Sequence, residues 1–140
     1  MEDPVARPRP DARGAGAVYW TAGTHGMLKI PKCSSCRRLH WYPRVRCPHC
    51  GSSELGWVHA SGRGVVHTYT VVRQSSDQYF KTRVPYVLAM IDLDEGVRIM
   101  SNVINCDVSD VSIGAPVAAV FETVAEGIGV PLFRLAALKQ

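Results

Sequence analysis

Two Cys-x-x-Cys pairs, in the stretch CSSCRRLHWYPRVRCPHC, constrain the fold of this chain more than any other feature of its sequence. A Cys-x-x-Cys turn brings two sulfurs to one side of a tight knuckle, and two facing knuckles complete a tetrahedral cage for zinc. The sequence therefore predicts a zinc ribbon whose ligands are Cys33, Cys36, Cys47 and Cys50. Because a closed cage of four cysteines leaves no position for water, we expect the Zn²⁺ to be structural rather than catalytic.

Other residues near the cysteine pairs are weaker candidates for chemistry. His40 and His49 could compete as zinc ligands, but we expect both to be structural or to face solvent. A thioredoxin-like redox role is disfavoured because the two pairs lack the strand–helix setting of that motif. The odd count of five cysteines disfavours a disulfide framework, so the remaining thiol, Cys106, is expected to be structural or incidental.

The length and composition are those of one ordinary globular domain. The chain has 140 residues, of which 46% are hydrophobic and 20% charged. Its longest apolar stretch, Val117–Val124, is far too short to cross a bilayer. The opening residues, MEDPVARPRPDARGAG, lack the basic-then-apolar layout of a secretory signal. We therefore expect a cytoplasmic protein that does not enter a membrane.

The amino-acid composition changes along the chain, and these changes predict five structural segments. The first is rich in proline and glycine, and the second carries large apolar residues, although Gly23 and Gly26 weaken any helix there. The expected segments are a disordered tail (1–16), a helical segment with a strand (17–31), the zinc ribbon (32–53), a β-barrel (54–135) and a second tail (136–140).

After Cys50, alternating apolar residues predict five or six strands of roughly eight residues. Val65–Val72 alternates at period two, and PYVLAMIDLDEG places Val87, Ala89, Ile91 and Leu93 on one face. Asp94-Glu95-Gly96 predicts a hairpin turn, DVSDV predicts a helical turn capped by Asp107, and 75–85 predicts a long loop. Because no crossover helix is available, we expect a mainly β chain with a closed or nearly closed barrel rather than a parallel sheet.

The net charge of the chain does not by itself identify a class of partner. It is +4, and a zinc held by four thiolates lowers it to about +2, which is too mild to indicate nucleic acid. The basic residues nevertheless gather around the cysteine pairs. This cluster is either a solvated surface that offsets the anionic metal site or a binding patch, and it comprises Lys32, Arg37, Arg38, Arg44 and Arg46.

The combination of these motifs resembles the acyl-CoA-associated zinc-ribbon/OB-fold family. The resemblance runs from Val18 to Arg134 through CSSCRRLHWYPRVRCPHCGSSEL, SGRGVVHTYTVV, PYVLAMIDLDEGVRIMSNV and IGAPVAAVFE. Double cysteine pairs occur in many ribbons, but Trp57, Gly62 and Gly64 after the second pair and the PYVLAMIDLDEG hairpin make the match more specific. The resemblance implies a short N-terminal helix, a rubredoxin-like zinc ribbon and a C-terminal OB-fold barrel.

The resemblance also implies an accessory subunit without catalytic residues of its own. Family members bind thiolase-like enzymes, acyltransferases or lipid-transfer-protein-type aldolases of steroid side-chain breakdown, and others are joined to hydratase-like domains that act on acyl-CoA. We accordingly expect a thiolase- or lipid-transfer-protein-like partner in a heterotetramer, with acyl-CoA as the ligand of the complex. Candidates for binding CoA phosphates are Arg37, Arg38, Arg44 and Arg46. Candidates for contacting the partner are Tyr19, Trp20, Tyr79, Phe80 and Arg83.

Two other functions remain open from the sequence. Ribbons and OB barrels also bind single-stranded nucleic acid, for which His67 and Tyr69 offer stacking surfaces. Acidic residues around the barrel argue against this alternative: Asp92, Asp94, Glu95, Asp107 and Asp110. A free-standing hydrolase or redox protein is the third possibility, but the sequence supplies no nucleophile paired with a base.

Overall fold

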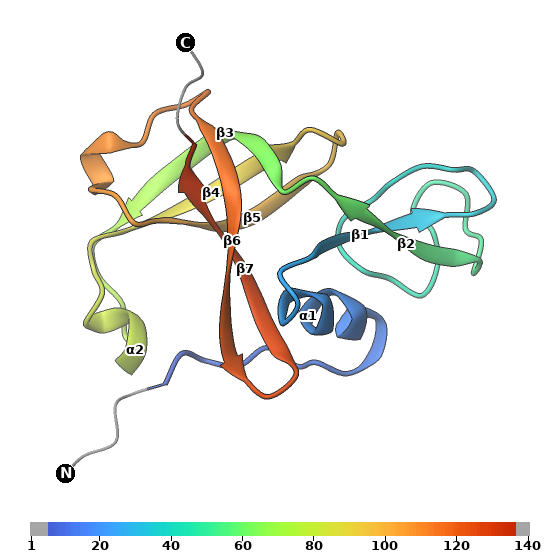
Figure 1. Ribbon diagram of the computed structural model, residues 1–140, viewed down its shortest axis with the longest axis horizontal. Helices are drawn as coiled ribbons and strands as arrows, with labels where there is room; N and C mark the ends of the chain where they lie inside the picture. The colour runs from blue at the N-terminus through green and yellow to red at the C-terminus, as the bar shows by residue number, and fades with distance from the viewer. Residues whose placement is uncertain (1–5, 137–140) are drawn as a thin grey trace.

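A closed β-barrel and a two-stranded ribbon lie side by side, with a short helix beneath their junction (Figure 1). The computed structural model describes residues 6–136, so parts of the predicted tails, 1–5 and 137–140, lie outside the described residues. The predicted mainly β class, with a short N-terminal helix, is confirmed. No helix in the described part of the chain has the length and apolar character needed to span a membrane.

The ribbon is built on one antiparallel ladder. Strand β1 (Leu28–Cys33) pairs with β2 (Leu55–Ala60), so that Leu28 lies opposite Ala60 and Cys33 opposite Leu55. The cysteine loops therefore leave from the end of the ladder that points away from the barrel (Figure 1). The other end of the ladder continues directly into the barrel through the turn before β3.

Five strands close the barrel in the order β3-β4-β5-β7-β6, with β3 and β6 completing the ring. Their bounds are β3 (Arg63–Val72), β4 (Tyr86–Leu93), β5 (Arg98–Ile104), β6 (Pro116–Ala125) and β7 (Ile128–Leu135). All neighbours are antiparallel except β5 and β7, which share a short parallel pairing at Val103–Phe133 and Ile104–Arg134. Closure leaves no open sheet edge, as expected for a chain without crossover helices.

Side chains point alternately into and out of the barrel along each strand, and the inward ones fill its interior. In β4 the predicted inward residues Val87, Ala89, Ile91 and Leu93 are all buried. Strand β3 departs from the simple pattern, because its register with β4 shifts between Val66 and Thr68. A bulge of this kind places an extra residue in one strand and re-aims the side chains that follow. His67 is that residue, and its side chain faces outward.

Helix α1 (Ala17–Gly23) is held against the barrel by two glycines. A β-carbon at Gly23 would overlap the carbonyl of Gly129 on β7, and one at Gly129 would overlap the backbone of Gly23. The sequence alone suggests only that Gly23 weakens the helix. In the structure Gly23 also allows the end of α1 to contact the β6–β7 hairpin backbone to backbone. Tyr19 and Ala22 are also buried on α1.

The predicted loop 75–85 contains one turn of helix. This turn, α2 (Gln78–Lys81), is capped by Asp77, whose carboxylate accepts hydrogen bonds from the amides of Tyr79 (2.9 Å) and Phe80 (3.1 Å). The 3₁₀ turn η2 (Val108–Asp110) lies where DVSDV predicts a helical turn. Asp107 caps it, and its amide donates to the Asp110 carboxylate at 3.1 Å.

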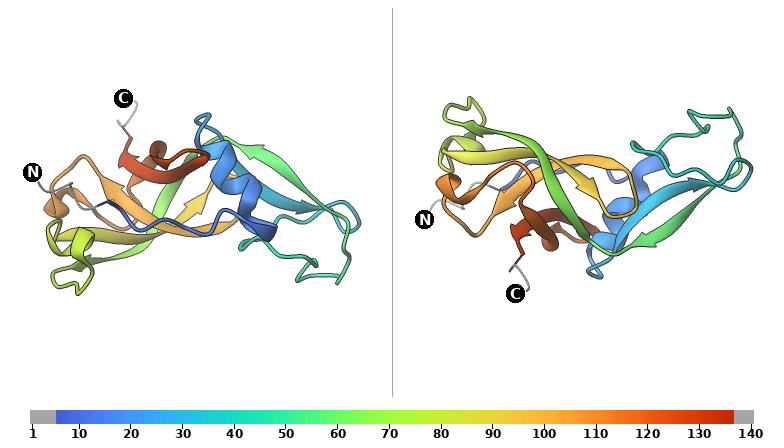
Figure 2. Two further views of the ribbon diagram at one scale, coloured as in Figure 1. Left: turned by 90° about the horizontal axis from the view of Figure 1, so that it is seen from below. Right: turned by 90° about the horizontal axis from the view of Figure 1, so that it is seen from above.

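The N-terminal segment follows the surface of the barrel. From Ala6 it runs past the β6–β7 hairpin to the 3₁₀ turn η1 (Gly14–Gly16), which leads into α1 (Figures 1 and 2). Residues 6–13 form neither helix nor strand, but Arg7 is anchored, because its side chain is only 15% exposed and bonds to Asn102 on β5.

Candidate metal centre and partner surfaces

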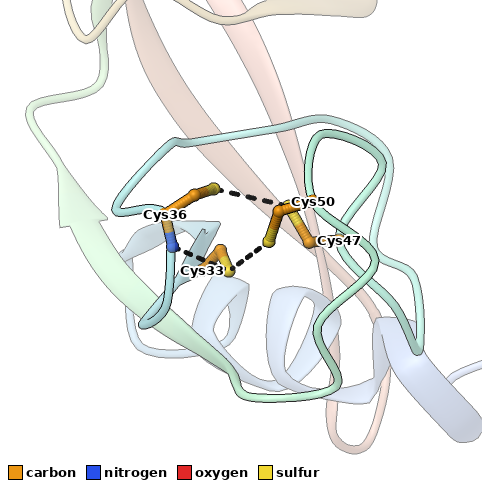
Figure 3. A group of neighbouring side chains, drawn as sticks. All are labelled: Cys33, Cys36, Cys47 and Cys50. Carbon is orange, nitrogen blue, oxygen red and sulfur yellow. Dashed lines mark hydrogen bonds between the residues drawn. The ribbon is translucent and has the colours of Figure 1, made fainter.

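The four cysteines converge at the tip of the ribbon, from two loops that face each other (Figure 3). All four sulfurs lie within 4.8 Å of one another. The Cys33–Cys50 sulfurs are 3.6 Å apart and the Cys36–Cys47 sulfurs 3.7 Å apart. Tetrahedral zinc with Zn–S bonds of 2.3 Å needs sulfurs separated by about 3.8 Å. The arrangement therefore fits Zn²⁺, and the predicted ligand set comes together as expected.

The two knuckles have the same backbone design. In each, the amide four residues after the first cysteine donates to that cysteine's carbonyl, from Arg37 to Cys33 and from Gly51 to Cys47, both at 2.9 Å. Arg37 (φ 64°) and Gly51 (φ 78°) both take the left-handed conformation that ends such a turn. The Cys33 sulfur also accepts from the Cys36 amide at 3.5 Å. These backbone hydrogen bonds place the four sulfurs in the arrangement that Zn²⁺ requires.

The four cysteine thiols are close enough that their ionisation requires a bound cation. The hydrogen bond from the Cys36 amide lowers the pKa of Cys33 to about 6. At Cys50 the Ser52 amide favours the thiolate, but the neighbouring Cys33 sulfur and burial outweigh it and raise the pKa to about 11. Sulfurs this close cannot all ionise without a counter-charge, and a divalent metal supplies it. With four sulfurs bound, zinc has no position left for water or substrate, so its role is structural.

The remaining candidates near the ribbon lie outside this cage. The histidines are not members of the cluster of potential ligands. His40 is 4% exposed, neither ring nitrogen has a partner among the described residues, and burial lowers the pKa of the ring. His49 is exposed and places Nε2 3.3 Å from the Leu39 carbonyl. Burial, with the nearby Asp110 and Asp107 carboxylates, raises the pKa of the Cys106 thiol, so this thiol has little tendency to ionise.

The ribbon surface is basic. The chain contains no acidic residue from Pro31 to Ser53 but includes Lys32 and the four arginines predicted to meet CoA phosphates. All four are exposed, and Arg46 donates to the Gly51 carbonyl at 3.2 Å. The four guanidinium groups therefore lie at the surface of the ribbon, on the segments that carry and join the cysteine knuckles.

An aromatic cleft of about 330 Å³ lies where α1, the ribbon and the barrel meet. Its lining combines Tyr19 and Trp20, both predicted to contact a partner, with residues for which the sequence predicted no role: Gly16, Trp41, Tyr42, Pro43 and Met100. Tyr42 and Met100 are each about half exposed, whereas Tyr19 is 5% exposed and packs beneath Trp20 and Trp41 at 4.7 and 4.6 Å between ring centroids. The aromatic run HWYP was the available signal for this cleft. Of the aromatic residues in this cleft, Tyr42 is the most exposed.

The α2 segment presents a second surface. Tyr79 is 6% exposed and forms the base of this segment, with the Arg83 guanidinium 4.2 Å above its ring. Phe80 packs edge-on against Tyr79 and at 5.2 Å against Tyr86 on β4. Of the three residues predicted to meet a partner in this loop, Phe80 and Arg83 remain available at the surface.

The barrel surface formed by β3, β4 and β5 contains an apolar cleft. A shallow cleft there is lined by Thr68, Tyr69, Thr70, Leu88, Ala89, Met90 and Met100, with no Lys or Arg among them. Nearby, Arg98 binds Asp92 through two hydrogen bonds of 2.6 and 3.2 Å and holds the pKa of that carboxyl below its usual value. Asp92 therefore has a structural partner on the hairpin, and the lining of this cleft offers no cation to a nucleic-acid backbone.

Two family models cover most of the chain. The model described as "ChsH2, rubredoxin-like zinc ribbon domain" matches residues 20–56, and "ChsH2, C-terminal OB-fold domain" matches residues 57–122. A solved structure described as "Ltp2-ChsH2(DUF35) aldolase" superposes with a TM-score of 0.82 and 32% identity, over 92% of this chain and 100% of that one.

Curated relatives carry two kinds of name. A "DUF35 domain-containing scaffold protein" of Methanothermobacter thermautotrophicus is 36% identical over 96 residues, which are 68% of this chain and 71% of that protein. A "Probable enoyl-CoA hydratase alpha subunit" of Thermomonospora curvata is 33% identical over 128 residues. That match covers 91% of this chain but 40% of the relative, so the relative contains a large region with no counterpart here.

Proposed function

The chain belongs to the ChsH2 (DUF35) family of zinc-ribbon and OB-fold proteins, and on that premise we propose that it is a non-catalytic accessory subunit of an enzyme that acts on acyl-CoA thioesters. The observation that carries the proposal is the likeness, over 92% of this chain, to a chain from an aldolase complex. The relative named as a hydratase alpha subunit points to the same substrate class.

The partner that we propose is a thiolase-superfamily or lipid-transfer-protein-like enzyme. Its reaction would make or break a C–C bond beside the thioester, by thiolysis, acyl transfer or retro-aldol cleavage, and the acyl group would come from steroid side-chain or aromatic acid degradation. A symmetric partner dimer that binds two copies of this chain gives a heterotetramer. The nucleophile and the acid–base groups belong to the partner, because the closed zinc site leaves no coordination position for substrate.

Two sets of residues have separate tasks in this proposal. Trp20 at the aromatic cleft, together with Phe80 and Arg83 on the α2 segment, contacts the enzyme, since aromatic and arginine side chains supply much of the binding energy at protein interfaces. The exposed guanidinium groups of the ribbon bind CoA phosphates as charge-assisted donors: Arg37, Arg38, Arg44 and Arg46.

Isolation of the tagged chain from the cells that produce it, with mass spectrometry of the bound proteins, tests this function. We expect a thiolase- or lipid-transfer-type enzyme in near-equal amount. A Phe80→Ala, Arg83→Ala double variant should bind that enzyme roughly 30-fold more weakly, as for loss of an interface hot spot of about 2 kcal/mol. Ile113→Ala, at a residue that is 70% exposed and outside both surfaces, is the matched control and should bind normally.

Recovery of nucleic acid and its enzymes in place of an acyl-CoA enzyme would reject the proposal in favour of single-strand binding. Equal binding by the double variant and the Ile113→Ala control would remove the α2 segment from the interface while leaving the accessory function in place.

A further inference from the structure

A cleft of about 370 Å³ lies between α2 and the barrel, and the chain's own N-terminal segment contributes one side chain to its wall. Its lining includes Tyr79 and Phe80 from the α2 segment, Asn102 from β5 and Glu122 from β6. That side chain is Arg7, which comes from a part of the sequence that has few apolar residues and was expected to be a disordered tail.

The groups around Arg7 are those that bind a guanidinium. Its Nη2 donates to the Asn102 side-chain oxygen at 3.2 Å, and Nη1 lies 3.9 Å from the Glu122 carboxylate. The guanidinium carbon lies 5.3 Å from the Phe80 ring centroid and 5.7 Å from that of Tyr79, which is the range of a cation–π contact. An acceptor, an anion and two aromatic rings thus converge on one cation.

The acceptor is fixed by the barrel itself. The Asn102 side-chain nitrogen donates to the Val87 carbonyl at 2.9 Å, and this bond turns the amide oxygen toward Arg7. The Arg7 side chain is 15% exposed, so its interactions are screened by water much less than those of a surface pair. The neighbouring Arg9 is exposed and lies outside the cleft lining.

We propose that the Asn102, Glu122, Tyr79 and Phe80 side chains form a guanidinium-binding site in the wall of this cleft, that the chain occupies this site with Arg7, and that residues 6–13 are a strap that orders α2 on the barrel. The strap joins three elements that are distant in sequence, α2, β5 and β6, through one side chain. It thereby sets the positions of Phe80 and Arg83, and the consequence for partner binding rests on the proposed function above.

Hydrogen exchange of the isolated full chain tests the strap. The reporters are the amides of Lys81 and Arg83, which donate to the Asp77 and Phe80 carbonyls at 2.8 and 2.9 Å. In Arg7→Ala we expect these two amides to exchange on the order of tenfold faster, because cation–π and hydrogen-bond contacts that favour the closed segment are lost. Amides of β4 and β5 should exchange as in the wild type, which shows that the barrel remains folded.

Two further measurements identify the cleft as the cause. Arg9→Ala removes the same charge from the same segment and should leave both reporters unchanged. Millimolar methylguanidinium should restore the protection of Lys81 and Arg83 in Arg7→Ala and have no effect on the wild type. Unchanged exchange in Arg7→Ala, or the same acceleration in Arg9→Ala, overturns the proposal. Because no partner is present, this result is independent of whether the accessory function is correct.

Discussion

Replacing Cys47 by serine is expected to abolish zinc binding and to unfold the ribbon. A serine hydroxyl cannot replace the thiolate that completes the cage, and structural zinc sites of this kind contribute on the order of 10 kcal/mol to the folded state. Metal analysis should fall from one zinc per chain to near zero, and the β1 and β2 amides should lose protection from hydrogen exchange. Because Leu28 and Ile30 of β1 belong to the same apolar core as the barrel, the barrel should also become less stable.

Cys106→Ser is the matched control for this change. It removes a thiol that is outside the four-cysteine cluster, so zinc content and ribbon protection should equal those of the wild type. Full zinc content in Cys47→Ser would contradict the four-cysteine site, and zinc loss in Cys106→Ser would contradict the structural assignment of the fifth cysteine.

Gly129→Ala is expected to lower stability by about 3 kcal/mol, the upper end of the cost of overpacking, and to lower Tm by roughly 10 °C. A methyl group at this position would overlap the backbone of Gly23 and Thr24. Neither chain segment can move aside like a flexible side chain, so α1 must separate from the β6–β7 hairpin. Separation would also disturb Tyr19, which supports the aromatic cleft from below.

Gly56→Ala provides the comparison for Gly129→Ala. Gly56 also lies in a strand, but a β-carbon there would come only to 3.9 Å from the Lys32 carbonyl oxygen, which is ordinary contact. Thermal unfolding of this variant should match the wild type within a few degrees. If the two variants unfold at the same temperature, the close approach of α1 to β7 is not a source of stability.

The metal site could be predicted from the sequence because its information is local. Ligand spacing within each Cys-x-x-Cys pair fixes the knuckle, and the two knuckles are close in the chain, so no tertiary information is needed to identify the four ligands. The inward residues of β4 could be predicted for a similar reason, since strand geometry alone imposes period two. In β3 the period-two alternation is interrupted by the bulge at His67. The position of this bulge depends on how β3 pairs with β4, which the sequence of β3 alone does not specify.

The contacts that depend on distant parts of the chain could not be predicted. Gly23 looks like a helix breaker until Gly129 is placed beside it, more than a hundred residues later. Arg7 lies in a stretch too polar to fold alone, and it becomes ordered through Asn102, Glu122 and the α2 aromatics. Single-sequence patterns contain no signal for such pairings.

The residues predicted to contact a partner differ in burial, and their residue types alone do not predict which of them are buried. Tyr19 and Tyr79 are almost fully covered by this chain, while Trp20, Phe80 and Arg83 remain accessible. One local signal was available: Asp77 before a short run with two aromatic residues is a typical helix N-cap, and it indicates the turn in which Tyr79 faces inward.

The proposed partner contact at the aromatic cleft would depend on zinc. Trp41, Tyr42 and Pro43 lie in the loop between the two cysteine knuckles, and they form one wall of the cleft that Trp20 shares. Holding both ends of this loop at the metal fixes that wall against α1. In the proposed complex the metal is therefore a structural support for an interface and takes no part in the reaction.

The most direct test of the accessory function is the activity of the partner enzyme on a panel of acyl-CoA thioesters, measured for this chain alone, for the partner alone and for the two together. We expect no turnover by this chain alone and a rate for the mixture well above that of the partner alone. The increase should disappear with Cys47→Ser and persist with Cys106→Ser. Turnover by the isolated chain, or a partner rate that this chain leaves unchanged, would contradict the account.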